Sequence, residues 1–241
     1  MSTRARWGCA AVIAAMLAGC AGHGEPVDAP SWAGGASGRS APTVTGERMM
    51  PELFGDGAMT RSYEAGSGEG VTITTERRGE RSFVVTERAG EEAFSESEIE
   101  ATESGVVLTR ITSHKRETIT DFRPPMVLMP MRAEAGFTIE QKLMMIVRPM
   151  DDPTRIKSRG TATYTLEYAG VSSVELAGGG AVEGASFVER LEASFPGASV
   201  MNVTRKWYAD GAGLIARQAE ESVSVLGLPA EQTVREVRRV D

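Results

Sequence analysis

Residues 71–86 read Val-Thr-Ile-Thr-Thr-Glu-Arg-Arg-Gly-Glu-Arg-Ser-Phe-Val-Val-Thr. β-Branched residues fill the first five positions, and such residues suit the pleated surface of a sheet. Arg78-Gly79 supplies a turn, and a second β-branched and apolar run returns over residues 81–86. Two runs of this kind around a short turn are typical of a β-hairpin. This stretch therefore predicts an antiparallel β protein.

Similar runs continue to the end of the chain, separated by short turns. They occupy residues 106–112, 118–122, 137–147, 161–168, 171–176, 183–195, 199–208, 214–226 and 231–240. Glycine and proline lie between many of them, as in Pro196-Gly197. Regular strands with turn signals predict one all-β domain of about ten antiparallel strands.

Four segments carry more specific expectations. Residues 93–102 fit a weak edge strand or a short helix, and we favour the strand. Pro124-Pro125 is expected to end the strand before it, because proline cannot donate to a β ladder. Residues 137–147 are apolar on both faces in their second half, which predicts burial on both sides or a cavity. Residues 49–54 are expected to form a helical turn or a loop over one end of the domain.

Length and charge limit the classes of function. The chain has 241 residues, and β-sandwiches and barrels of this size are often single domains. It carries 26 Lys and Arg against 33 Asp and Glu, a net charge of −7. This acidic balance argues against nucleic acid as a partner, because phosphate binding needs a basic surface. It also argues against attachment to an anionic bilayer by charge alone.

The chain begins with a basic head and a short apolar run. Arg4 and Arg6 precede the apolar residues 7–17, and the run ends in Leu17-Ala18-Gly19-Cys20. This order is the signature of a secretory signal. A transmembrane helix needs about 20 apolar residues, so this run is too short. A signal peptide without lipid and a buried N-terminal helix of the domain remain alternatives, although the loose segment that follows disfavours the buried helix.

The Leu-Ala-Gly-Cys ending resembles the lipobox of bacterial lipoproteins. In that family the cysteine is acylated and the residues before it are removed. The resemblance implies a signal peptide over residues 1–19, cleavage between Gly19 and Cys20, and a membrane partner reached through lipid on Cys20. The next residue is Ala21 rather than the Asp that retains some lipoproteins at the inner membrane. We therefore expect the periplasmic face of the outer membrane in preference to the inner membrane.

Residues 20–46 are expected to form a lipidated flexible tether, and residues 47–241 the β domain. The tether is rich in Gly, Ala, Ser and Pro and cannot bury enough apolar surface to order itself. Trp32 is its one large apolar residue. It can touch the membrane interface or dock on the domain, but a solvated linker residue is the expectation.

The inventory of chemically active residues is small. The two cysteines are Cys9, in the part that would be removed, and Cys20, which would carry lipid. The mature domain then has no thiol for a disulfide, a metal or a nucleophile, and no cofactor or metal is expected. His23 lies in the tether and His114 at an expected strand end. Neither forms part of a recognisable catalytic or metal-binding pattern.

Six of the twelve methionines fall between residues 126 and 150. Methionine fills irregular gaps, so core packing is the first interpretation. The alternative is an adaptable wall for a lipid or another apolar ligand, and a thioether copper site is a remote third. The candidate apolar ligand surface consists of Met126, Met129, Leu143, Met145 and Trp207.

The last third of the chain resembles a family of uncharacterised bacterial exported proteins. The shared pattern is Gly184-x-x-Phe187, followed by Thr204-x-x-Trp207-Tyr208-Ala209-x-Gly211-x-Gly213-Leu214-Ile215. The resemblance implies a large curved antiparallel sheet or open barrel. Such a fold is similar to the lipoprotein carrier and receptor that move lipids between bacterial membranes. We transfer no functional residue from those proteins.

Together these observations favour a noncatalytic envelope lipoprotein. It would bind an apolar ligand or act as a scaffold. The alternative is an envelope hydrolase with an unrecognised carboxylate site, since two carboxylates on neighbouring strands can meet for acid–base chemistry. No pair is marked out by the sequence: Asp151-Asp152 precedes a proline and fits a turn.

Overall fold

The structure is a computed structural model, and it describes residues 29–35, 41–54 and 58–240. The predicted signal peptide, Gly19 and Cys20 lie outside the described residues. Part of the predicted tether is described, and it is not separate from the domain, as shown below.

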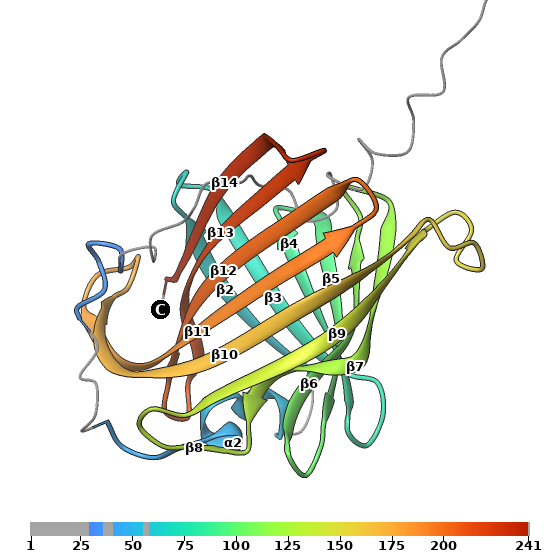
Figure 1. Cartoon of the computed structure of the whole chain (residues 1–241). Coiled ribbons are helices and arrows are strands. Elements are labelled where there is room, and N and C mark those ends of the chain that lie inside the picture. Colours follow the sequence, from blue (N-terminus) through green and yellow to red (C-terminus); the bar gives the residue numbers. More distant parts are fainter. Residues whose placement is uncertain (1–28, 36–40, 55–57, 241) are drawn as a thin grey trace, which may run out of the picture.

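Twelve antiparallel strands close into a barrel (Figure 1). Their order around it is β10-β11-β12-β13-β14-β2-β3-β4-β5-β6-β7-β9, so most strands lie beside their neighbours in sequence. The prediction of an all-β fold with a curved antiparallel sheet is confirmed. The strands are β2 (Met59–Ala65), β3 (Gly70–Arg77), β4 (Ser82–Ala89), β5 (Glu92–Ala101), β6 (Gly105–Ser113), β7 (Thr118–Pro130), β9 (Thr138–Pro149), β10 (Ser158–Glu175), β11 (Ala181–Phe195), β12 (Ala198–Ala209), β13 (Gly213–Val225) and β14 (Leu228–Arg239).

Alternation along the strands fills the barrel interior. In β11, Phe187, Leu191, Ala193 and Phe195 are buried, as their shared face in the sequence predicts. They belong to a main hydrophobic cluster that also takes residues from β4 to β10, β12 and β13. The interior of this barrel is therefore largely occupied by its own side chains.

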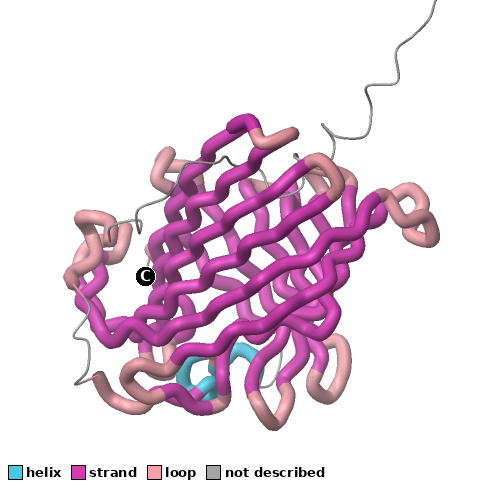
Figure 2. Tube along the Cα trace, in the orientation of Figure 1, coloured by secondary structure: helices cyan, strands magenta, loops and turns pink. Residues whose placement is uncertain are grey.

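One end of the barrel is covered by a short plug. It consists of α2 (Gly46–Met49) and the 3₁₀ turn η2 (Pro51–Leu53), and it carries almost all the helix in Figure 2. Met49 and Leu53 are buried in the main cluster. Next to the plug, β1 (Val44–Thr45) pairs with β8 (Arg132–Ala133). The prediction of a helical turn over one end is confirmed.

Trp32 is not a solvated linker residue, and that expectation is wrong. Its ring packs edge-on against Trp207 with centroids 5.0 Å apart. Its indole N–H donates to the Glu236 carboxylate over 3.2 Å. The next residue, Ala33, forms a β-bridge with Val174 of β10. The sequence composition of this segment hid the docking because only one large side chain carries it.

Pro124-Pro125 does not end its strand, because β7 continues through both residues to Pro130. The ladder with β6 passes from Asp121 to Met126, and the ladder with β9 stops at Arg123. The two prolines therefore lie where neither neighbouring strand requires an amide donor. Residues 93–102 do form a strand, β5, as favoured.

The expected two-sided burial of β9 holds only in part. Leu143, Met145 and Val147 face the core, and Ile146 is buried on the opposite face. Met144, however, is 40% exposed. The outer face of this strand is therefore covered near its end and open to solvent in the middle.

The barrel closes at a weak seam between β14 and β2. Only the three residue pairs Val237↔Ala65, Arg238↔Glu64 and Arg239↔Tyr63 join these strands. By comparison, β14 pairs with β13 from Leu228 to Arg238. Closure of the barrel thus depends on a short ladder, and most of β14 is hydrogen-bonded only to β13.

Candidate functional site

The five residues of the predicted apolar ligand surface do not form one surface. Met126, Met129, Leu143 and Met145 lie in the main core cluster and are at most 6% exposed. Trp207 belongs to a second cluster with Val174 and Ile215, against which Trp32 packs. None of the five lines the cavity described next. The structure gives these residues packing roles.

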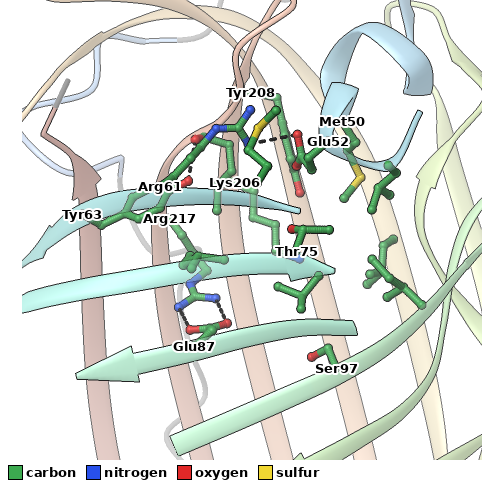
Figure 3. A pocket seen from close by; sticks show the side chains of 17 residues that line it. Met50, Glu52, Arg61, Tyr63, Thr75, Glu87, Ser97, Lys206, Tyr208 and Arg217 are labelled. Atoms are coloured by element: carbon green, nitrogen blue, oxygen red, sulfur yellow. Dashed lines mark hydrogen bonds and ion pairs between the residues drawn. The ribbon is translucent and has the colours of Figure 1, made fainter. Parts of the chain in front are cut away.

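A cavity of about 110 Å³ lies inside the barrel beside the plug (Figure 3). One part of its wall is apolar. That part comes from the plug and from strands on both sides of the seam: Met50, Leu53, Met59, Ile73, Val85, Ile99, Leu128 and Leu214. The other part is polar and consists of Glu52, Arg61, Tyr63, Thr75, Glu87, Ser97, Lys206, Tyr208 and Arg217.

Arg61 and Glu52 form an ion pair between β2 and the plug. Arg61 Nη1 donates to Glu52 Oε2 over 2.9 Å, and both side chains are largely buried. Gly213, with φ of +78°, lies directly beside this pair. A Cβ atom there would come within 2.5 Å of Arg61 Nη1 and 2.7 Å of Glu52 Oε2. The glycine of the sequence pattern therefore makes room for the ion pair as well as for the turn.

Arg217 and Glu87 form a bidentate ion pair across the seam region, from β13 to β4. The two N–H···O distances are 2.7 and 2.6 Å. Burial raises the pKa of Glu87, but the charge and hydrogen bonds of Arg217 outweigh it and hold the pKa below its usual value. The same contacts raise the pKa of Arg217 against the effect of its own burial. Both groups therefore stay charged.

A third ion pair joins Lys206 of β12 to Glu189 of β11 over 2.6 Å. Two tyrosines lie near Glu189, and burial raises the pKa of both Tyr164 and Tyr208. The Tyr164 hydroxyl is buried and has no hydrogen-bond partner among the described residues. Tyr63 donates to the Leu214 carbonyl over 2.9 Å, and burial raises its pKa to about 12. These hydroxyls remain protonated.

The arrangement provides polar recognition next to an apolar wall. Each of the three cations has its own carboxylate, so the charges in this region balance. The lining carboxylates Glu52 and Glu87 are both engaged by arginine. His114 does not line the cavity and lies 3.0 Å from Glu96.

Within the part of the chain that the structure describes, no group of three or more His, Cys, Asp or Glu side chains is placed to hold a metal ion. No helix in residues 29–35, 41–54 or 58–240 has the length and hydropathy needed to cross a membrane.

The sequence alone marked none of the residues that line this cavity as part of a site. The available signal was the alternation of side chains between the two faces of a strand. Tyr208 is buried, and Lys206 lies two residues before it, on the same face of a strand. Arg217 pairs directly with Lys206 and therefore shares that face. The carboxylate partners come from distant strands, and no local pattern reveals them.

Three solved structures resemble this chain, with low sequence identity and low TM-scores. A protein assigned as exported, with a YmcC-like fold, from Bacteroides fragilis is 9% identical, with 76% of this chain and 93% of that chain covered and a TM-score of 0.37. A protein assigned as a lipoprotein, from Parabacteroides distasonis, is 9% identical, with 78% and 95% covered and a TM-score of 0.37. The hypothetical lipoprotein YmcC from Escherichia coli is 10% identical, with 81% and 89% covered and a TM-score of 0.35. No protein-family model and no curated protein matches the sequence.

Proposed function

We propose that the protein is a lipid-anchored envelope protein whose barrel binds a small amphipathic solute without chemical conversion. The observation that carries the binding proposal is the cavity between three ion pairs and an apolar wall. Ligand pockets combine apolar lining with a few placed polar groups, and this cavity has that composition. A solute with one polar end and a short apolar body matches both parts of the wall.

The size of the cavity limits the ligand. One water needs roughly 10–15 Å³ by the same kind of measure, so about 110 Å³ accommodates several waters or one small molecule. A diacyl lipid is far larger. We therefore replace the expected lipid-sized apolar ligand by a small amphipathic one.

Three largely buried ion pairs support the binding proposal over a purely structural interior. Burying paired charges is costly, and well-packed apolar residues of similar volume are often as stable or more so. Charged groups beside a cavity that holds a small molecule, on the other hand, give hydrogen bonds to a polar ligand. The engagement of Glu52 and Glu87 by arginine is the reason we propose binding in preference to the hydrolase alternative.

Titration with a homologous series tests the binding proposal. We would measure heat on adding straight-chain carboxylates, from butanoate to decanoate, to the full chain in lipid nanodiscs, with empty nanodiscs as the blank. We expect saturable binding up to a limiting chain length. Ser97→Phe fills the cavity and should abolish the heat. Thr86→Phe adds the same bulk on the outer face of β4, between two cavity residues, and should not. Equal non-saturable heats for all carboxylates would contradict the proposal.

The anchor is supported by the lipobox-like ending and is tested separately. We propose acylation at Cys20 and attachment to the periplasmic face of the outer membrane. Intact-mass measurement of the protein from its own host should show loss of residues 1–19 and added acyl mass on Cys20. Cys20→Ala should prevent both the loss of residues 1–19 and the added acyl mass. A chain that retains residues 1–19, or an unmodified sulfur at Cys20, would overturn the anchor.

A further inference from the structure

β14 presents an open edge to solvent along most of its length. Its pairing with β2 begins only at Val237, and one further backbone bond joins Gly66 N–H to the Glu236 carbonyl. Residues 228–235 have no strand partner on that side among the described residues. The β13–β14 hairpin projects beyond the rest of the barrel in Figure 1.

The backbone groups on this edge can be assigned by parity. The Glu236 carbonyl points toward β2. Because edge-facing groups alternate along an antiparallel strand, Val234 and Gln232 also direct their N–H and C=O groups to the open side. Val234 is 54% exposed, and Leu226 and Leu228 at the hairpin tip are 75% and 70% exposed.

This edge has only part of the usual protection against pairing. Edge strands are commonly blunted by charged side chains, lysine above all, and by proline, bulges or a covering segment. Here Pro229 and a register shift next to Ser224 occur only near the tip. Residues 230–235 contain no proline and no lysine. An edge of this kind is a template for another strand.

We infer that the open edge of β14 pairs antiparallel with β14 of a second copy of this chain, about a twofold axis at Thr233. The charge pattern carries the choice of partner and of register. Glu231 and Arg235 are exposed, lie on one face, and are equally spaced on either side of Thr233. The twofold axis places each Glu231 opposite the other copy's Arg235, so both pairs are attractive.

Other registers lose this match. Moving the axis to Gln232 places Glu231 opposite Thr233 of the second copy, and the two charge pairs disappear. Opposed residues in a twofold ladder must share a face, so the axis has to coincide with a residue. In the inferred register the peptide hydrogen bonds run between Gln232 and Val234 of the two copies.

Cysteine cross-linking in membranes tests the pairing with the full chain. In the inferred register, Thr233 lies opposite Thr233 of the second copy in a non-hydrogen-bonded pair. The two Cα atoms are roughly 4.5 Å apart, which is within disulfide range. Thr233→Cys should therefore give a disulfide dimer under mild oxidation. Gln232→Cys, one position away and on the other face, should give far less. The wild-type chain controls for Cys9 and Cys20.

Charge reversal tests the register with the same cysteine reporter. With Thr233→Cys as the reporter, Glu231→Arg should lower the cross-linked fraction about tenfold, because two attractive pairs become repulsive. Arg235→Glu should do the same, and the double reversal should restore cross-linking. The inference is overturned if neither cysteine variant cross-links, if Gln232→Cys is preferred, if the double reversal fails to recover, or if the product contains a different protein.

Discussion

Arg217 and Glu87 show how one buried pair depends on both members. The guanidinium makes two hydrogen bonds to the carboxylate inside the barrel. Removing one member leaves an uncompensated buried charge, whereas replacing both with apolar groups removes the cost of desolvation as well. The pair is therefore far more sensitive to single than to double substitution.

We predict that Arg217→Met lowers the free energy of unfolding by about 3 kcal/mol, the low end of the range for buried pairs, because the two side chains are 23% and 15% exposed. Arg217→Met combined with Glu87→Leu should recover most of that loss. Urea unfolding at neutral pH, followed by circular dichroism, measures both changes. A double variant that is less stable than the single one would contradict this account of the pair.

Glu221 contrasts with Glu87, because the surroundings of Glu221 raise its pKa and disfavour its ionised form. Burial raises its pKa from 4.5 to about 7, despite attraction from Arg116 and Arg235. Arg116 Nη2 lies 3.8 Å from Glu221 Oε1. Between these two pKa values the folded protein keeps a proton that the unfolded chain has lost. The contribution of Glu221 to stability must therefore fall as pH rises through that window.

We predict that Glu221→Gln removes the loss of stability that the wild type shows as pH rises. At one pKa unit per about 1.36 kcal/mol, the variant should gain up to roughly 3 kcal/mol over the wild type between pH 4.5 and pH 7. The measurement is the difference in unfolding free energy between variant and wild type at pH 4.5, 6 and 8. Glu87 does not interfere, because its lowered pKa confines its effect to more acidic pH. A difference that does not change with pH would contradict the prediction.

At the scale of elements, the segment around Trp32 acts as a strap on the outside of the barrel. It bonds to β10 through Gly34 N–H to Ser173 O at 2.8 Å and Glu175 N–H to Trp32 O at 2.9 Å. Trp32 also reaches β12 through Trp207 and β14 through Glu236. The strap thus joins three strands of the C-terminal half to the chain segment that follows Cys20.

We predict that Trp32→Ala loosens the strap, with a loss of about 2 kcal/mol from lost aromatic packing and burial. Trp207 would then be exposed, and its fluorescence emission should shift to the red. Trp32→Phe is the matched control, because it keeps an aromatic ring but loses the hydrogen bond to Glu236. Unchanged emission in the alanine variant would show that the strap does not cover Trp207.

The elements that could be predicted are those with local period-two signals. β3, β4, β11, β12 and β13 follow from alternation and turns, and the Gly211–Gly213 turn lies where the sequence places it. The strap and the run of β7 through Pro124-Pro125 could not be predicted, because both depend on which neighbour lies beside them. The cavity is likewise only partly predictable. Alternation along each strand shows which charged residues face inward, but their ion-pair partners come from other strands that no local pattern identifies.

At the scale of the whole molecule, the β14–β2 seam is the weakest point of the barrel. Three residue pairs hold it, whereas β10 and β11 pair along most of their length. Val237 and Tyr63, in a small cluster with Val71, cover the seam from inside. Opening energies in proteins vary with local pairing and burial, so this seam should open before other ladders.

We predict that the pair Ala65→Cys and Val237→Cys locks the seam. Gly66 donates its N–H to the Glu236 carbonyl, so the next pair along the ladder, Ala65 and Val237, is a non-hydrogen-bonded pair. The Cα atoms of such a pair are roughly 4.5 Å apart, which suits a disulfide. Because the bridge closes most of the domain into one loop, it should add up to about 5 kcal/mol. Among the barrel ladders, hydrogen exchange in the wild type should be fastest at the seam pairs, residues 63–65 and 237–239, and should slow there on oxidation. Reduction of the same sample is the control, and equal exchange in both states would place the first opening elsewhere.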